Sequence, residues 1–160
     1  MHADPHPGNF LVSEEGQLIA LDFGCMKLLP EDFYAPYFEL FNIDVLEDPR
    51  LFHDKLLELE ILRIDDSEGE VACFTNMFHD VLSFLTQPFR EETFNFSDQG
   101  FFDKLGAIGE RYFKDTRTKK MNANRGSRHF IYMNRTFFGL FNLMFDLKAE
   151  NIRISNFKNL

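Results

Sequence analysis

The feature that most constrains the fold of this 160-residue chain is a pair of short polar motifs that flank two brief apolar runs. The first motif, His-Ala-Asp-Pro-His-Pro-Gly-Asn, covers residues 2–9, and the second, Asp-Phe-Gly, covers residues 22–24. Between them lie Phe-Leu-Val, a five-residue turn that contains a glycine, and Leu-Ile-Ala-Leu. Two apolar runs joined by such a turn predict a β-hairpin over residues 10–21. Because a hairpin reverses the chain, it returns the second motif to the neighbourhood of the first.

Beyond residue 30 the sequence predicts helices, because apolar residues recur at the three- and four-residue spacing of an amphipathic helix. Asp48 before Pro49 predicts a helix start, and the apolar pattern extends that helix to about Arg63. Ser67 and Glu70 form a capping box that introduces the next helix. The apolar face predicted for that helix consists of Val71, Phe74, Phe78, Val81 and Leu85.

Three further stretches also have a helical pattern. One covers residues 99–116, and another begins near Arg128. The apolar side predicted for the latter contains Phe130, Met133, Phe137, Leu140, Phe141 and Met144. The third, residues 31–47, is rich in Phe and Tyr, and Pro36 is predicted to break or kink it. The fold class is therefore mainly α, with one short hairpin that precedes a helical body whose Phe stripes form the core.

The composition excludes several classes of protein. Seventeen Lys and Arg against 26 Asp and Glu give a net charge of −9, which argues against a nucleic-acid partner. No apolar run reaches the roughly 18 residues of a membrane span, and the first residues lack the pattern of a signal peptide. Cys25 and Cys73 are too few for a disulfide framework and favour a reducing compartment. We therefore expect a cytoplasmic protein, with peripheral contact at the inner membrane as a further expectation.

The spacing of the polar residues matches the needs of phosphoryl transfer. Such a site uses one carboxylate to orient the attacking hydroxyl, and a second carboxylate with an amide oxygen to hold Mg²⁺ against the nucleotide phosphates. Protein kinases take these groups from the motifs H-R-D-x-x-x-x-N and D-F-G. Here Asp4 precedes Asn9 by five residues, and Asp22 follows after the hairpin. Turn formation is the alternative role for each residue alone, but the full pattern favours a kinase-like site.

The amino-acid sequences of the two motifs closely resemble those of the UbiB/AarF family of atypical kinases. That family has a protein-kinase-like fold and is linked to ubiquinone and isoprenoid-lipid metabolism. The resemblance rests on residues 2–25, and the helical remainder is compatible with the family's C-terminal lobe. It implies that Asp4 is the catalytic aspartate, that Asn9 and Asp22 bind Mg²⁺, and that ATP is the nucleotide. It also implies a supporting role for His2, His6, Gly8, Phe23 and Gly24.

The two histidines of the first motif allow an alternative. His2 and His6 stand four residues apart, a spacing that serves zinc when it lies on a helix. The intervening prolines predict an extended loop instead, so we expect His2 to brace the loop and His6 to support its backbone. Gly8 and Gly24 are expected to adopt backbone conformations that other residues avoid.

The family's N-terminal lobe supplies a nucleotide-covering loop, a lysine–glutamate pair and a KxGQ-containing extension, and none of these precedes Asp4 in this sequence. We therefore assign residues 1–150 to a partial kinase-like domain, with its helical C-lobe over residues 30–150, and residues 151–160 to a C-terminal tail. The leading interpretation is the C-lobe of a UbiB-type kinase or ATPase, inactive as this fragment alone and missing its N-lobe. The alternatives are the C-lobe of a small-molecule phosphotransferase of the aminoglycoside or choline kinase type, and a non-catalytic helical remnant or binding module.

One segment departs from the acidic average. Residues 111–128 hold seven basic side chains and a single acidic one. Cations near a helix C-terminus are favoured by the helix dipole, which gives a purely structural interpretation. The alternative is contact of Arg111–Arg128 with an anionic membrane surface, where each basic residue contributes about 1 kcal/mol.

Overall fold

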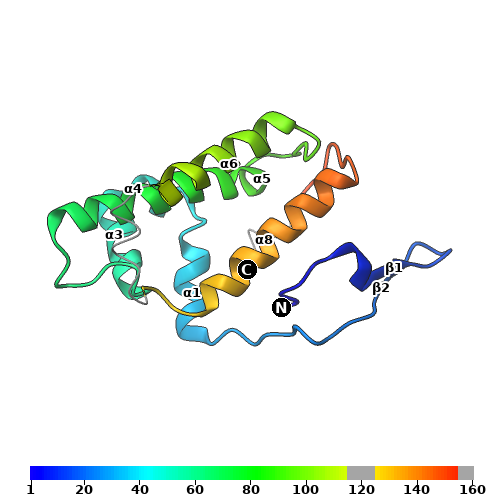
Figure 1. Cartoon of the computed structure of the whole chain (residues 1–160), viewed down its shortest axis with the longest axis horizontal. Helices are drawn as coiled ribbons and strands as arrows, with labels where there is room; N and C mark the ends of the chain where they lie inside the picture. The colour runs from blue at the N-terminus through cyan, green and yellow to red at the C-terminus, as the bar shows by residue number, and fades with distance from the viewer. Residues whose placement is uncertain (115–124, 155–160) are drawn as a thin grey trace.

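A computed structural model describes residues 1–114 and 125–154 and contains a two-stranded hairpin beside a helical body (Figure 1). Strands β1 (Phe10–Val12) and β2 (Leu18–Ala20) pair antiparallel, with Phe10 opposite Ala20. In the turn between them Gly16 has a φ of 79°, a left-handed conformation that glycine adopts without a Cβ clash. The hairpin predicted from the sequence is confirmed.

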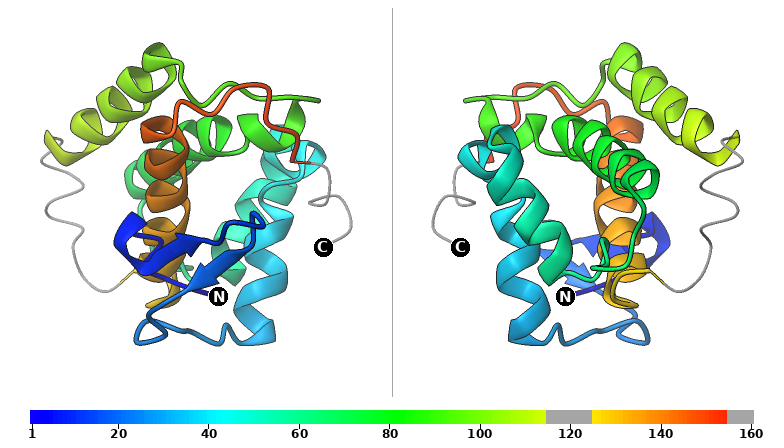
Figure 2. Two further views of the ribbon diagram at one scale, coloured as in Figure 1. Left: turned by 90° about the vertical axis from the view of Figure 1, so that its right-hand side faces the viewer. Right: turned by 90° about the vertical axis from the view of Figure 1, so that its left-hand side faces the viewer.

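The helical body begins with α1 (Glu31–Glu39), and residues 21–30, which include the second motif, connect it to β2. A 3-10 turn, η1 (Pro7–Asn9), precedes β1. The helices that the structure describes are α1 (Glu31–Glu39), α2 (Ile43–Glu47), α3 (Pro49–Glu58), α4 (Glu68–Leu85), α5 (Gln87–Arg90), α6 (Gln99–Lys114) and α8 (His129–Asp146). Figures 1 and 2 show α8 beside the N-terminal segment, with α4 and α6 farther from the hairpin. The mainly α class is confirmed.

The two predicted helix starts are built as the sequence indicates. Asp48 accepts hydrogen bonds from the backbone N–H groups of Arg50 (2.8 Å) and Leu51 (3.1 Å) at the start of α3. At the start of α4, the Ser67 hydroxyl accepts from the Glu70 N–H (3.4 Å), and the Glu70 carboxylate accepts from the Ser67 N–H (2.9 Å). These side chains satisfy amide groups that have no partner within the helix.

Helix α3 ends at Glu58, five residues before the end predicted near Arg63. Glu60 takes a left-handed φ of 59°, and the Ile61 N–H turns back to the Leu56 carbonyl (2.9 Å). This arrangement satisfies a carbonyl at the helix end. The apolar pattern continues past Glu58 because the residues after the turn also enter the core.

Pro36 lies within α1 and does not end it, so the break that was one of the two predicted effects does not occur at this residue. The helix continues through Pro36 to Glu39, and the interruption lies at residues 40–42, before the Asn42 side chain caps α2. Pro36 is itself buried, so its ring packs in the core while the helix loses one backbone hydrogen bond.

The core lies between α1, α3, α4, α6 and α8 and is filled largely by Phe rings, as predicted. Typical contacts are the Phe41–Phe137 pair (5.3 Å between ring centroids) and the Phe94–Phe101 pair (5.0 Å). On α8 the predicted face is buried at Met133, Phe137 and Phe141, whereas Leu140 is 40% exposed. Beyond α8, Ile152 forms an isolated β-bridge with Phe94.

The basic segment Arg111–Arg128 is only partly described, because residues 115–124 lie outside the described residues. Three of its described cations form ion pairs with carboxylates of the same chain: Arg111 with Asp80, Lys114 with Glu110, and Arg125 with Asp66. Of the helices described, none is both long and apolar enough to cross a membrane. The predicted tail also lies outside the described residues from position 155 onwards.

Candidate functional site

The two polar motifs lie side by side because the chain pairs at both ends of each motif. At the base of the hairpin, the Leu21 N–H donates to the Asn9 carbonyl (2.8 Å). On the other side, the Ala3 N–H donates to the Cys25 carbonyl (3.0 Å), next to an isolated β-bridge between residues 2 and 26. The hairpin thus brings together segments that are about twenty residues apart.

His2 contacts the backbone of both motifs through its two ring nitrogens. Nε2 lies 2.8 Å from the Asp22 carbonyl, and Nδ1 lies 3.3 Å from the Asp4 N–H. A neutral ring with its proton on Nε2 satisfies both contacts, donating to Asp22 and accepting from Asp4. His2 is therefore placed where a bracing residue is expected.

Asp4 and Asn9 are in direct contact. The Asn9 side-chain Nδ2 donates to the Asp4 backbone carbonyl (3.0 Å) and to Asp4 Oδ2 (3.3 Å). This bonding directs the amide nitrogen toward Asp4, and no hydrogen bond to Asn9 Oδ1 occurs among the described residues. The Asp4 side chain is 41% exposed, so the pair lies on a solvent-open face.

Asp22 is exposed at the end of the hairpin. Its Oδ1 accepts a hydrogen bond from the Gly24 N–H (2.7 Å). No partner of Oδ2 is found within the described part of the chain. Asp22 therefore presents one carboxylate oxygen to solvent, close in the chain to the strand end that pairs with Asn9.

At each of the two glycines of the motifs a Cβ would crowd a neighbouring side chain, and neither glycine has a left-handed backbone. A Cβ at Gly24 would lie 3.1 Å from Asp22 Oδ1, and one at Gly8 would lie 3.1 Å from His6 Nδ1, which accepts the Gly8 N–H. Neither glycine is among the positive-φ residues of the described chain. The prediction that Gly8 and Gly24 adopt conformations closed to other residues is therefore wrong.

Helix α8 supplies two contacts to the first motif that the sequence analysis missed. Arg135 Nη2 lies 2.9 Å from Asp4 Oδ1, and the Thr136 hydroxyl lies 3.3 Å from the His2 carbonyl while making its shorter hydrogen bond (2.9 Å) to the Tyr132 carbonyl of its own helix. The contacts with Asp4 and His2 each join residues more than 130 positions apart. No local pattern could have predicted these pairs.

A third contact of α8 is steric. A Cβ at Gly139 would lie 2.6 Å from Cγ of Pro5, so only glycine allows the proline ring to approach the helix this closely. The sequence contains an indication of this contact, because an isolated glycine among bulky helical residues is consistent with another part of the chain packing closely against the helix. Lys27, just after the second motif, adds a cation–π contact with Tyr132 of the same helix (4.5 Å to the ring centroid).

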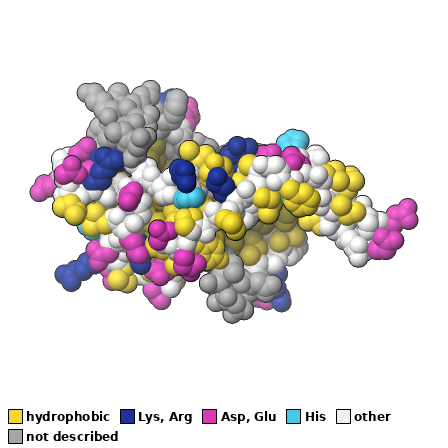
Figure 3. Space-filling view, turned by 90° about the horizontal axis from the view of Figure 1, so that it is seen from below, with side chains coloured by type: hydrophobic (Ala, Val, Ile, Leu, Met, Phe, Trp, Pro, Cys, Tyr) yellow, Lys and Arg dark blue, Asp and Glu magenta, His cyan; other side chains and the backbone are white. Residues whose placement is uncertain are grey.

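The hairpin beside the site is strongly apolar on its surface. Leu11, Val12, Leu18 and Ile19 are all exposed, as is Phe23 of the second motif. Figure 3 shows hydrophobic side chains gathered on this projecting arm, with acidic side chains at its tip. Consecutive strand residues point to opposite faces, so both faces of the hairpin are uncovered.

The donor set around the motifs consists of oxygen atoms. Both ring nitrogens of His2 contact the backbone, and Nδ1 of His6 accepts from Gly8. The part of the chain that is described contains no group of three or more His, Cys, Asp and Glu placed to hold a metal ion. The zinc alternative thus finds no supporting geometry, whereas the carboxylate of Asp22 and the amide oxygen of Asn9 are ligands of the kind that Mg²⁺ prefers.

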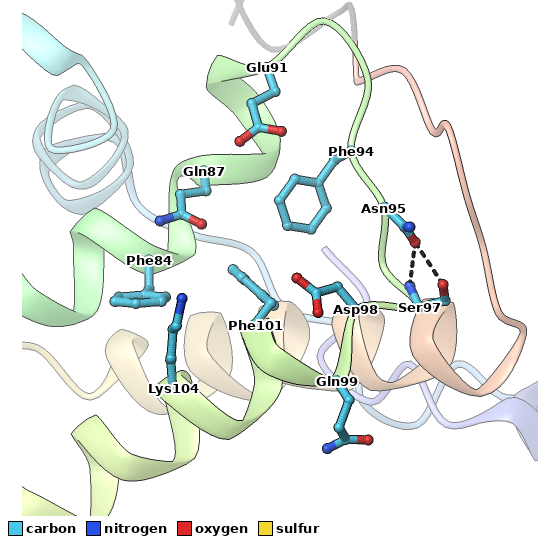
Figure 4. A pocket seen from close by; sticks show the side chains of 10 residues that line it. All are labelled: Phe84, Gln87, Glu91, Phe94, Asn95, Ser97, Asp98, Gln99, Phe101 and Lys104. Atoms are coloured by element: carbon cyan, nitrogen blue, oxygen red, sulfur yellow. Dashed lines mark hydrogen bonds between the residues drawn. The ribbon is translucent and has the colours of Figure 1, made fainter.

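A cavity of about 560 Å³ lies elsewhere, between α5 and the start of α6 (Figure 4). Its charged wall residues, Glu91, Asp98 and Lys104, are exposed, and its Asn95 side chain is bonded to Ser97 (2.8 and 2.9 Å). None of the residues proposed from the motifs lines it. The size of this cavity alone does not connect it with the chemistry of the two motifs.

Comparison with known proteins identifies a family model and several relatives. Residues 1–52 match the family model described as the ABC1 atypical kinase-like domain. An uncharacterized aarF domain-containing protein kinase, chloroplastic, of Arabidopsis thaliana is 72% identical over 83 residues, which is 51% of this chain and 12% of that protein. Protein ACTIVITY OF BC1 COMPLEX KINASE 3, chloroplastic, also of Arabidopsis thaliana, is 58% identical over 31 residues, or 19% of this chain and 4% of that protein.

An uncharacterized protein of Synechocystis sp. is 33% identical over 94 residues, which is 58% of this chain and 16% of that protein. The matched parts thus span less than a fifth of the length of each of these relatives. No solved structure matches the chain.

Proposed function

Residues 1–52 belong to the ABC1 atypical kinase-like family, as the resemblance to UbiB/AarF kinases predicts, and on that premise we propose that this chain provides the catalytic and metal-binding face of a Mg²⁺–ATP-dependent kinase or ATPase. The observation that carries the proposal is the contact of Asp4 with Asn9 on an open face, joined through the backbone to the segment of Asp22. The link to ubiquinone and isoprenoid-lipid metabolism is part of the same proposal.

Asn9 and Asp22 are the proposed Mg²⁺ ligands, through the amide oxygen and the uncommitted carboxylate oxygen. Mg²⁺ in nucleotide sites takes one or two protein ligands, several waters and phosphate oxygens, so two protein donors are sufficient. When bound there, the ion neutralises charge on the phosphates. The hydrogen bonds of Asn9 Nδ2 and of Asp22 Oδ1 restrain the two side chains, while Asn9 Oδ1 and Asp22 Oδ2 have no hydrogen bond in the described part of the chain.

Asp4 is the proposed catalytic carboxylate, which orients an acceptor hydroxyl or a water molecule. Asn9 donates to its Oδ2 and Arg135 to its Oδ1. A carboxylate oxygen can accept two hydrogen bonds, so each oxygen of Asp4 can still accept one from the substrate hydroxyl or the water molecule. The two donors fix the direction of the carboxylate, and positioning of this kind is the main task of the protein in phosphoryl transfer.

The exposed apolar hairpin is proposed as the surface on which the N-lobe of a complete kinase-like domain packs. Apolar surface of this extent on a soluble protein usually marks an interaction site. An isolated two-stranded hairpin is also marginally stable in water. The N-lobe of the family would add the lysine that pairs with the phosphates.

The test is ATP hydrolysis by a chimera that joins the N-lobe of the 72%-identical Arabidopsis relative to this chain. We expect Mg²⁺-dependent turnover that falls at least a hundredfold with Asp22→Ala, while Asp32→Ala, an exposed carboxylate on α1, leaves it unchanged. A chimera that folds and binds ATP but is insensitive to Asp22→Ala would contradict the metal-ligand role. A chimera without any nucleotide binding would favour the non-catalytic alternative, a helical remnant or binding module.

Membrane contact through Arg111–Arg128 is a separate proposal that rests on charge in the sequence. The described ion pairs of Arg111, Lys114 and Arg125 reduce the number of cations available to lipid headgroups. Co-sedimentation of the chain with vesicles that contain 30% phosphatidylserine, compared with neutral vesicles, tests it. Equal partitioning to both would contradict it.

A further inference from the structure

An apolar cavity of about 240 Å³ lies between α1, α4 and α8. Helix α1 contributes Tyr37, helix α4 contributes Met77 and Val81, and helix α8 contributes Phe130 and Asn134. The α8 residues belong to a different stripe of the helix from those that contact the first motif. No residue of the proposed phosphoryl-transfer site lines this cavity.

The cavity wall contains a hydroxyl group with no partner in the described part of the chain. Tyr37 is only 2% exposed, and its hydroxyl is not among the unpaired polar atoms that are fully buried, so the small accessible surface of this residue includes the hydroxyl. Burial raises the pKa of this hydroxyl, so it is a protonated donor at neutral pH. A bound acceptor would add a hydrogen bond that the described protein groups do not supply.

The rest of the wall disfavours water. A buried water molecule needs two to four polar partners, and the cavity offers the Tyr37 hydroxyl and, where it reaches the surface, the exposed side chain of Asn134. The remaining wall residues are aliphatic or aromatic. Apolar protein cavities of about 150 Å³ stay dry and bind benzene, so this larger one has room for a ring with a substituent.

We propose that this cavity is a binding site for a compact apolar molecule with one hydrogen-bond acceptor, of the size of an aryl ketone. The Tyr37 hydroxyl donates to the acceptor, and the apolar walls contact the ring. This inference is independent of the proposed phosphoryl-transfer function, because it uses none of the same residues.

The test compares two probes of the same shape, acetophenone and α-methylstyrene, which differ in a carbonyl oxygen against a methylene group. Binding is followed by NMR through the methyl group of Met77, at the cavity, with the exposed Met26 methyl as the internal control. We expect acetophenone to shift the Met77 signal and to bind about three- to tenfold more tightly than α-methylstyrene. Absence of a shift at Met77, or a shift of equal size at Met26, would overturn the site.

Three variants assign the contact. Tyr37→Phe should remove the preference for acetophenone, whereas Tyr34→Phe, which removes a hydroxyl from the same helix outside the cavity, should keep it. Val81→Phe should fill the cavity and abolish binding of both probes. Retained preference in Tyr37→Phe would overturn the role of the hydroxyl, and the wild-type Met77 measurement decides the site even if Val81→Phe does not fold.

Discussion

Arg135 and Asp4 are 131 residues apart in the sequence, yet the guanidinium of one lies 2.9 Å from the carboxylate of the other. Both side chains are about half exposed, 54% for Arg135 and 41% for Asp4. Exposed pairs of this kind contribute about 0–1 kcal/mol to stability. The contact therefore matters more for the orientation of Asp4 than for the fold.

Replacing Arg135 should separate these two effects. In Arg135→Met we expect the free energy of unfolding to change by less than about 1 kcal/mol, while turnover by the chimera falls about tenfold as the carboxylate loses one of its two donors. The measurements are urea denaturation and steady-state ATP hydrolysis. Arg153→Met is the matched control, since Arg153 forms an exposed pair with Glu92 away from the site, and it should change neither quantity.

Gly139 fixes the distance between α8 and the first motif. Gly139→Ala places a methyl group 2.6 Å from Pro5 Cγ, and overpacking of this kind costs about 1–3 kcal/mol, more than the helix propensity of alanine returns. We expect a lower melting temperature and shifted amide NMR signals over residues 2–9. Gly106→Ala in α6, where a Cβ meets nothing within 4 Å, should instead stabilise the protein by about 0.5–1 kcal/mol. The same sign for both variants would contradict the steric interpretation.

The Asp66–Arg125 pair predicts a specific acid sensitivity. Two hydrogen bonds of 2.6 Å from Arg125 lower the pKa of Asp66 below its ordinary value of 3.8, and the Asp66 side chain is only 4% exposed. Because the folded-state pKa is depressed, the pair stabilises the fold fully above the unfolded pKa and loses this contribution as pH falls through the folded pKa.

We therefore expect Asp66→Asn to lower the free energy of unfolding by about 3 kcal/mol at pH 7 and to flatten its decline below pH 4. Urea denaturation between pH 2 and pH 7 measures both effects. Asp65→Asn, at the exposed neighbouring carboxylate, should reproduce the wild-type curve. A parallel decline in the wild type and Asp66→Asn would contradict the assignment.

The 160-residue chain by itself should bind Mg²⁺–ATP with a Kd above about 1 mM, equivalent to about −4 kcal/mol, and should hydrolyse it negligibly. The proposed ligands Asn9 and Asp22 give the metal only two protein donors, and none of the residues of the two motifs is a lysine or arginine that could contact the phosphates. Isothermal titration calorimetry measures this affinity. Low-micromolar binding that disappears in Asp22→Ala would show that the chain is a self-sufficient nucleotide site.

Features that depend on neighbours in the sequence were predictable. The hairpin follows from two apolar runs and a glycine turn, and the starts of α3 and α4 follow from side chains that bond amides two or three residues ahead, at Asp48 and Ser67. The end of α3 was not predictable, because it depends on the left-handed backbone conformation of Glu60, which glutamate does not favour. Leu140 was placed in the core by its periodicity, but it lies at the edge of the buried stripe.

The parts of the candidate site that could be predicted from the sequence are likewise those formed by residues close together in the chain. The motif spacing predicted that residues 2–9 and 22–24 meet, since a hairpin must return the chain. The contributions of Arg135 and Thr136 were not predictable, because their partners lie more than 130 residues away and the approach of α8 depends on the packing of the whole helical body. The isolated Gly139 could have indicated a close contact on α8, but not that Pro5 is its partner.

The hairpin is joined at its base to the strand ends beside Asn9 and Asp22, and its tip projects away from the helices (Figure 1). The N-lobe is proposed to pack on this arm, and Mg²⁺ is proposed to bind Asn9 and Asp22. If packing on the arm changes the separation of these two side chains, assembly and metal binding are linked equilibria: the factor by which the N-lobe tightens Mg²⁺ binding equals the factor by which Mg²⁺ tightens N-lobe binding.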